Sequence, residues 1–331
     1  MRRQPRPFQS SLAGHFADFL RHHRALGKSF QTEERALRLF DQYLVEQPVH
    51  NPAEITPAVL EGFLGSRTRP ISKSYNHLLG VVRRWCNWMV RQERIPHSPL
   101  LLRPQRLTGT KVPFLFDPVT ARQLLAIAAQ LPDNNHARQR GLVYSTVFAL
   151  LYGLGLRVGE AVRLRIRDVD WVRHVLTIRE TKFAKSRLVP FGPKIAAMLG
   201  DYRARRKPGW ALLDDADPLF SFDPKGHDLI HPGTISQTFH HLWPRLNITV
   251  PEGVAHPRLH CLRHSFAVGT LLGWYRAGIN PNERLLQLST FMGHSHPSST
   301  SVYLTITSEL FQEANRRFER FAGVLLKGVT T

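Results

Sequence analysis

Four prolines interrupt the chain between residues 95 and 116, and basic side chains lie between them. Proline fixes φ and removes a backbone donor, so neither a helix nor a central strand can run through this stretch. A chain of 331 residues is long enough for one hydrophobic core on each side of it. The sequence therefore predicts a basic arm over residues 1–9, a first domain over residues 10–103, a linker over residues 104–116 and a second domain over residues 117–331.

The first domain carries apolar side chains at helical spacing in four stretches. They lie at residues 12–26, 37–44, 57–64 and 75–89. Thr56 followed by Pro57 is typical of a helix start, because threonine caps the first turn and proline lacks an N–H that would be unpaired there. These patterns predict a small all-helical bundle.

The second domain mixes two periodicities. Residues 141–152 and 260–277 have helical patterns, and Asp117 before Pro118 predicts another helix start. Residues 175–178 and 187–191 are typical of two strands of a hairpin, and Ser308 could cap a final amphipathic helix that reaches Leu325. The expected fold class is mainly α with a small β-sheet, in which the second domain is mixed α+β.

The net charge is the strongest compositional signal. The chain has 45 Lys and Arg against 25 Asp and Glu, a formal net charge of +20. The favoured partner of such a chain is nucleic acid, and the alternative is a basic RNA-associated or membrane-surface protein. Residues 1–103 hold 16 basic against 8 acidic side chains. We therefore expect DNA-backbone contacts from Arg83, Arg84 and Arg91 in the fourth helical stretch, and from Lys111 in the linker.

Cysteine usage and hydropathy limit the compartment. Cys86 and Cys261 have no CxxC neighbour, so neither a disulfide framework nor a zinc ribbon is expected. The basic N-terminus is not followed by an apolar stretch, and no run of 18 apolar residues is present. These features predict a cytoplasmic protein without a membrane partner.

Three stretches of the second domain carry side chains suited to phosphate chemistry. They are Gly155–Glu160, His260–His264 and Phe291–Tyr303. Attack on a phosphodiester without a metal needs fixed cations, a proton for the leaving alkoxide and an activated nucleophile. Two arginines, the histidines and one tyrosine supply these groups. Taken singly, each arginine fits a surface ion pair equally well, and Tyr303 fits a packed aromatic residue better.

A metal site is not predicted. His260 and His264 have the i, i+4 spacing of a zinc-binding helix, but Cys261 stands where that motif needs glutamate. No acidic third ligand is near in sequence, so we expect neither a metal nor another cofactor.

The three stretches, in this order and spacing, resemble the tyrosine recombinases of the phage integrase family. The resemblance covers nearly the whole chain and implies a SAM-like, helical core-binding domain that clamps DNA, followed by a catalytic domain. It further implies that Arg157 and Arg263 hold the scissile phosphate and that Glu160 supports them. Tyr303 would attack to form a 3′-phosphotyrosyl bond without metal or ATP.

The other implied roles concern protons. The resemblance assigns His260 as general acid/base, His294 as hydrogen-bond donor to the phosphate, and a hairpin lysine as donor to the leaving 5′ oxygen. The family pattern places this donor five residues before Arg187, which makes Lys182 the expected donor. The turn Thr181–Ser186 lacks the family's glycine-rich form, so Lys185 stays open as the alternative or as a phosphate contact. His264 and His296 are expected to have structural or supporting roles.

The expected function is therefore site-specific recombination or integration of DNA, as in transposition of a mobile element. The alternatives are a topoisomerase or telomere resolvase with the same chemistry, and a DNA-binding protein that does not cleave. The expected partners are double-stranded DNA with an inverted-repeat core site and three further copies of the chain in a synaptic tetramer. Accessory proteins stay open, and the expected location is the bacterial nucleoid.

Overall fold

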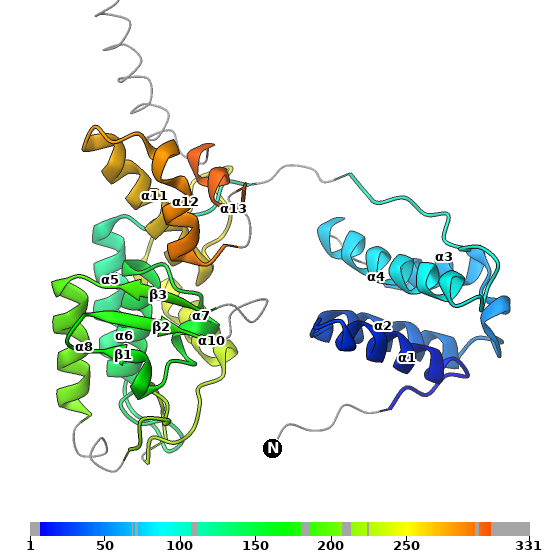
Figure 1. Ribbon diagram of the computed structural model, residues 1–331, viewed down its shortest axis with the longest axis horizontal. Helices are drawn as coiled ribbons and strands as arrows, with labels where there is room; N and C mark the ends of the chain where they lie inside the picture. The colour runs from blue at the N-terminus through cyan, green and yellow to red at the C-terminus, as the bar shows by residue number, and fades with distance from the viewer. Residues whose placement is uncertain are drawn as a thin grey trace, which may run out of the picture. The chain divides into compact units, whose positions relative to one another are not determined.

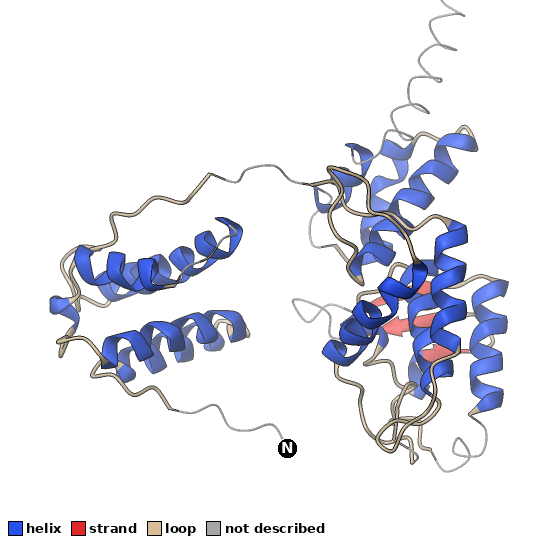
Figure 2. Cartoon of the chain, turned by 180° about the vertical axis from the view of Figure 1, so that it is seen from behind, coloured by secondary structure: helices blue, strands red, loops and turns tan. Residues whose placement is uncertain are grey.

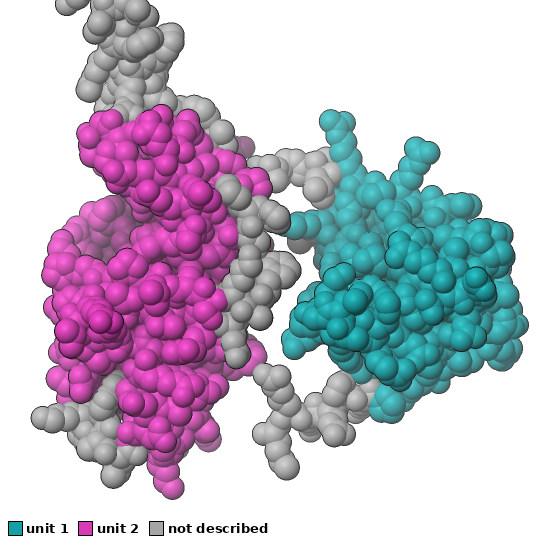
Figure 3. Space-filling model, in the orientation of Figure 1, with its two compact units in different colours: residues 1–110 teal, residues 111–331 magenta. Residues whose placement is uncertain are grey.

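The structure, a computed structural model, describes residues 7–67, 69, 72–106, 111–179, 186–206, 213–223, 225–294 and 298–305. The chain divides into two compact units, Met1–Thr110 and Lys111–Thr331, and each has its own hydrophobic core (Figure 3). The turn lysines Lys182 and Lys185, His296 and the expected final helix over residues 308–325 lie outside the described residues.

Unit 1 contains the expected helices. They are α1 (Ala13–Ala25), α2 (Gln31–Val45), α3 (Pro57–Ser66) and α4 (Ser72–Arg91), with a short 3₁₀ turn, η1 (Pro52–Glu54), between α2 and α3. Thr56 caps α3 as predicted, because its side chain accepts a hydrogen bond from the backbone N–H of Val59. The core is aromatic: Trp85 is fully buried, with its ring 4.9 Å from that of Phe16 and 5.8 Å from that of Phe40.

The arginines of α4 are less uniform than expected. Arg83 donates to the carbonyl of Leu102 at 2.7 Å, and Arg84 lies 3.4 Å from the carboxylate of Glu33. The excess of basic over acidic side chains in residues 1–103 therefore does not leave Arg84 without an acidic neighbour, because α2 brings Glu33 beside it. Arg91 is exposed at the C-terminal end of α4.

The proline-rich stretch is held at both described ends. Asn76 and Gln105 exchange two hydrogen bonds of 2.7 Å, which fix the first end along α4. At the other end the N–H of Val112 donates to the carbonyl of Gly253, and Phe116 donates to Ser265 Oγ at 2.7 Å. Residues 112–116 therefore belong to the fold of unit 2, although proline and basic residues made them look like linker.

Unit 2 is mainly helical around a small antiparallel sheet. Strands β1 (Val169–Asp170), β2 (Val175–Ile178) and β3 (Arg187–Pro190) pair in the order β1-β2-β3. In the β2–β3 hairpin, Val175 pairs with Pro190 and Ile178 pairs with Arg187. The sheet lies on one side of the unit in Figure 1, and helices cover it in the view from behind (Figure 2). This arrangement confirms the predicted fold class.

The helices of unit 2 position the candidate site. They are α5 (Pro118–Ala129), α6 (Arg140–Gly153), α7 (Val158–Ala161), α8 (Pro193–Arg205), α10 (Pro232–Leu242), α11 (His260–Arg276), α12 (Pro281–Met292) and α13 (Ser298–Ser301), with the 3₁₀ turns η2 (Ile166–Asp168), η3 (Trp243–Leu246) and η4 (Val302–Thr305). Helix α6 is buried over most of its surface and packs against α5, α8 and α11. A second apolar cluster joins α11, α12 and η4, and includes Tyr303.

Both cysteines are buried and free. No helix in the described part of the chain is long and apolar enough to cross a membrane.

Candidate active site

A glycine turn places Arg157 at the start of α7. Gly155 has φ +60°, and a Cβ atom there would lie 2.4 Å from the ring of Phe266. Only glycine combines this left-handed backbone with so close a neighbour. Arg157 follows in extended conformation as the N-cap residue of α7, with its side chain about one-third exposed.

Glu160, in the first turn of α7, is the acidic centre of the site. Its carboxylate accepts the backbone N–H of Arg157 at 3.0 Å and Nη1 of Arg157 at 2.7 Å. Arg187, the first residue of β3, donates both terminal nitrogens to the two carboxylate oxygens at 3.1 and 2.9 Å. Burial by itself raises the pKa of Glu160, but the hydrogen bonds and charges of Arg187 and Arg157 lower it to about 2. The carboxylate is therefore ionised at neutral pH and orients two arginines.

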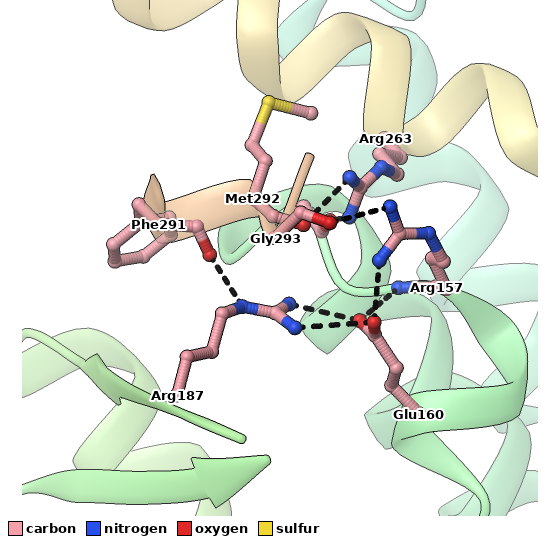
Figure 4. Close-up of polar contacts among 8 residues, drawn as sticks. Arg157, Glu160, Arg187, Arg263, Phe291, Met292 and Gly293 are labelled. Atoms are coloured by element: carbon pink, nitrogen blue, oxygen red, sulfur yellow. Dashed lines mark hydrogen bonds and ion pairs between the residues drawn. The ribbon is translucent and has the colours of Figure 1, made fainter. Parts of the chain in front are cut away.

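Three arginines from different elements meet the C-terminal end of α12 (Figure 4). Successive carbonyls of Phe291, Met292 and Gly293 accept from Arg187 Nε at 2.7 Å, Arg263 Nη2 at 2.7 Å and Arg157 Nη2 at 2.8 Å. The last carbonyls of a helix lack partners within it, and the helix dipole favours cations there. The end of α12 thus fixes three guanidinium groups close together.

Arg263 is the most buried of these cations. It lies in α11, is 1% exposed, and donates to the carbonyls of Gly155 and Met292. Burial, and then the charge of Arg157, lower the pKa of Arg263 to about 10, so it remains protonated at neutral pH. Its hydrogen-bond acceptors are neutral carbonyls, which leave its positive charge available to an anion.

Tyr303 lies beside these arginines in η4 and is 4% exposed. Its hydroxyl is 3.0 Å from Nδ1 of His264, and its ring stacks on that of His294 with centroids 6.2 Å apart. Burial raises the pKa of Tyr303, and Arg263 and Arg157 offset only part of that rise. The phenol is therefore protonated at neutral pH.

The histidines are neutral at neutral pH. Burial, and then Arg263 and Arg157, lower the pKa of His294 to about 4. The pKa of His260 also falls to about 4. The main cause is desolvation of its ring, which meets the ring of His264 edge-on with centroids 4.6 Å apart, although much of the residue is exposed. His264, Arg263 and Arg157 lower the pKa further, because they disfavour another positive charge. Burial and Arg263 lower the pKa of His264. The site is already strongly positive, so it disfavours extra protons.

The contact between His294 and Thr300 bears on which ring nitrogen of His294 carries the proton. Its Nδ1 lies 2.7 Å from Thr300 Oγ1. A threonine hydroxyl that donates to Nδ1 leaves the proton on Nε2, which is then a donor for a further group.

The structure brings most of the candidate residues together. Arg157, Glu160, Arg263, His264, His294 and Tyr303 form one connected set of contacts, and His260 joins it through His264. Two features were missed. The sequence predicts Arg187 only as the start of a strand, and it does not predict the contact of His264 with Tyr303. Among the described residues no group of three or more His, Cys, Asp or Glu side chains is arranged to hold a metal ion.

Comparison with known proteins agrees with this geometry. Residues 116–309 match the phage integrase family. A Sinorhizobium fredii protein assigned as an integrase/recombinase, y4rB, is 35% identical over 308 residues, covering 92% of this chain and 95% of that protein. The chain belongs to the phage integrase family. A Thermosipho africanus tyrosine recombinase is 24% identical over 89% of this chain and 94% of its own.

Solved structures show the same fold. The structure of the Tn1549 transposon integrase in complex with transposon right-end DNA aligns with a TM-score of 0.65 at 18% identity, covering 95% of this chain and all of that chain. XerH bound to a palindromic difH substrate aligns with a TM-score of 0.63 at 17% identity, covering 94% of this chain and 85% of that chain. With the matches to recombinases along the sequence, these establish a tyrosine site-specific recombinase, and the topoisomerase-like and non-cleaving alternatives are not favoured.

Proposed function

We propose that this recombinase cuts and rejoins double-stranded DNA through a covalent 3′-phosphotyrosyl bond to Tyr303. One observation carries the proposal: the Tyr303 hydroxyl lies 3.0 Å from His264 Nδ1, in the same set of contacts that fixes Arg157 and Arg263 at the end of α12. The charges of the two arginines offset part of the rise that burial causes in the pKa of Tyr303. A phosphate between these arginines would meet cations and a nucleophile at once.

The proposed reaction needs no outside energy source. The Tyr303 oxygen attacks phosphorus as the phenol gives its proton to the neutral His260, the proposed general acid/base. The bond from phosphorus to the 5′ oxygen breaks, and the leaving oxygen takes up a proton. We assign that proton to Lys182, with Lys185 as the alternative donor. The phosphotyrosyl bond keeps the energy of the broken bond, so a 5′ hydroxyl can reverse the reaction and rejoin the strand.

The charges of the site fit the transition state of this step. Arg157 and Arg263 would stabilise the extra negative charge on the phosphate oxygens without a metal, because their positions are fixed before DNA arrives. Glu160 holds Arg157 through two hydrogen bonds and is the supporting residue. His294 would donate Nε2–H to a phosphate oxygen, since its Nδ1 already contacts Thr300.

The remaining histidines would handle protons. His264 Nδ1 is the partner of the Tyr303 hydroxyl and would orient it before attack. His260 would act as general acid/base at the more exposed side of the same set. A recess of about 250 Å³ lies beside it, lined in part by His240 and Arg258, and could admit the neighbouring DNA backbone.

The complexes of similar proteins support a proposal about the partners. XerH was solved on a palindromic substrate, and lambda integrase as a dimer on a core site. We propose that this chain likewise recognises an inverted-repeat core site, assembles into a homotetramer on two such sites, and moves a mobile element in a bacterial nucleoid. Unit 1, with Arg83, Arg84 and Arg91, would clamp the DNA, and Lys111 would contact its backbone.

Trapping on a suicide substrate tests the proposal. A nick just downstream of the cleavage site lets the short fragment that carries the new 5′ hydroxyl diffuse away, so the strand cannot be rejoined and the protein stays attached to DNA. Tyr303→Phe should bind DNA but form no adduct on a denaturing gel. The matched control is Tyr275→Phe, because Tyr275 packs on the same apolar cluster. An adduct that persists in Tyr303→Phe, or disappears equally in Tyr275→Phe, contradicts the assignment.

A further inference from the structure

Arg187 is a buried cation with every arm of its guanidinium group in use. Its side chain is 8% exposed. Nη1 and Nη2 bind the two oxygens of Glu160, and Nε binds the carbonyl of Phe291 at 2.7 Å. A buried ion pair is weak grounds for a stabilising role, since an apolar pair of similar volume often stabilises a fold as well or better. The cost of burying this charge points to a role beyond packing.

The contacts of Arg187 join three segments of the site. Arg187 opens β3, Glu160 lies in α7 beside Arg157, and Phe291 lies at the end of α12, two residues before Gly293. Glu160 and Gly293 are also the two partners of the Arg157 side chain. Arg187 therefore binds one partner of Arg157, Glu160, directly, and binds the chain two residues before the other partner, Gly293.

We infer that Arg187 is a positioning residue for strand cleavage, which acts through Glu160 and the end of α12 to hold Arg157 and the Gly293–His294 step in their working geometry. The inference rests on the proposed function, because it concerns the same cleavage step. Lysine could replace the charge of Arg187, but its single ammonium group cannot match the carboxylate fork and the carbonyl together.

Gly293 fits closely beside Arg187. A Cβ atom at Gly293 would lie 2.6 Å from Arg187 Nη1, and Gly293 has φ +68°. Alanine there would push the guanidinium group away from Glu160. Gly253 gives a matched control in the same unit, because it has φ +76° and no atom within 4 Å of an added Cβ. Both substitutions strain the backbone, and only the first displaces Arg187.

The first experiment compares cleavage at saturating DNA among three full-length variants. Arg187→Met should slow cleavage about 10²-fold with near-normal binding, as small displacements of positioned groups can do. Arg187→Lys should recover part of that loss. Arg179→Met is the control. Arg179 directly follows β2, the other strand of the same hairpin, and it also pairs with a buried carboxylate, that of Asp168 at 2.5 Å. It should cleave at nearly the wild-type rate.

The pH profile separates positioning through Glu160 from a general loss of structure. Glu160 faces Arg157, Arg187, Arg263 and His294, and Arg187 is the largest influence that lowers its pKa. Loss of Arg187 therefore raises the pKa of Glu160 from about 2. Cleavage by Arg187→Met should then fall toward acidic pH more steeply than cleavage by wild type. Adding Glu160→Gln should remove that extra steepness, while it slows cleavage further at every pH because Glu160 also accepts two hydrogen bonds from Arg157.

The outcomes decide the inference separately from the proposed function. Cleavage by Arg187→Met within about threefold of wild type, or a pH profile parallel to that of wild type, overturns the positioning role. If Arg187→Met does not fold, slower cleavage by Gly293→Ala than by Gly253→Ala supports the inference, and equal rates overturn it. Tyr303→Phe is assayed in parallel, and an adduct from that variant would instead count against the proposed function.

Discussion

The arginines of unit 1 and those of the unit 2 site differ in burial and in partners. The Arg84 side chain is 46% exposed with one long contact to Glu33, and Arg91 is exposed. In the site, by contrast, Arg263 is 1% exposed and the Arg187 side chain 8% exposed, and each donates to defined acceptors. The same residue type therefore occurs as a solvent-exposed cation at Arg84 and Arg91 of unit 1 and as a buried, hydrogen-bonded cation in the site.

This difference separates binding from catalysis. Exposed cations attract phosphates by a salt-dependent effect that does not require fixed geometry. Burying a cation costs desolvation free energy. A buried cation in a fixed position can in turn stabilise the negative charge that develops at one place in the transition state. We therefore expect substitutions in unit 1 to change affinity and salt dependence, and substitutions in the site to change the rate of cleavage.

The largest effect is expected at the two arginines beside Tyr303. Arg263→Lys and Arg157→Lys should each slow cleavage by roughly 10²-fold or more, because lysine cannot keep two directed hydrogen bonds and also face the phosphate. Affinity should change far less. Single-turnover cleavage at saturating DNA measures the rate, and Arg91→Ala is the control from unit 1. A cleavage defect in Arg91→Ala as large as that in Arg263→Lys would break the comparison.

Loss of the proposed proton donor, Lys182, should slow cleavage by a similar factor, but only on DNA with a normal phosphodiester. Lys182→Ala should slow cleavage of normal DNA about 10²-fold or more, because the leaving alkoxide is strongly basic. In a substrate with sulfur in place of the bridging 5′ oxygen, the leaving group is a thiolate, which needs no proton donor. The variant should therefore cleave this substrate at nearly the wild-type rate. Lys185→Ala should lose affinity alone. Sulfur rescue in Lys185→Ala would move the role of proton donor to that residue.

Much of the fold could be predicted because it depends on neighbours in sequence. The caps at Thr56 and Asp117 and the helical periodicities require only local information, and the structure confirms them. Gly155 and Gly293 stand in motifs whose residue types already suggest close backbone approach. The candidate site residues were predicted from a family resemblance, and each of the three motifs that carry it is also short and local in sequence.

Features that depend on distant contacts were harder to predict. Arg187 lies 104 residues from Phe291 along the chain, so no local pattern shows that they meet. One signal was available: Val189 and Phe191 are buried, and the period of two in a strand places Arg187 on the same face. Residues 112–116 were assigned to a linker because prolines mask the two phenylalanines, Phe114 and Phe116, that anchor them in unit 2.

Removal of unit 1 should weaken DNA binding without abolishing it. A fragment that starts at Lys111 should bind the core site about tenfold or more weakly, and its affinity should fall less steeply with salt, by about 0.9 slope units per lost phosphate contact. Titrations of fragment and full chain over a range of salt concentrations measure both quantities. Equal slopes would show that the exposed arginines of unit 1 do not contact DNA.

The smallest effect concerns pH and local stability. The pKa values of His260 and His294 are about 4 in the folded protein against 6.5 when unfolded. The unfolded state therefore binds more protons, and stability of the site region is present above pH 6.5 and lost as pH falls toward 4. Hydrogen exchange should show α11 losing protection over this range more than α4. His294→Asn should reduce the difference, and equal pH dependence of the two helices would contradict the assigned electrostatics.

The most direct test of the account identifies the atom that becomes bonded to DNA. The full chain is trapped on a suicide substrate in the presence of a metal chelator, the complex is digested, and the peptide that carries nucleotide is sequenced by mass spectrometry. We predict a single modified residue, Tyr303, linked to a 3′ phosphate, with undiminished yield in the chelator. A nucleotide on any other side chain, or a yield that collapses when metal is removed, would contradict the claim that fixed arginines activate this tyrosine.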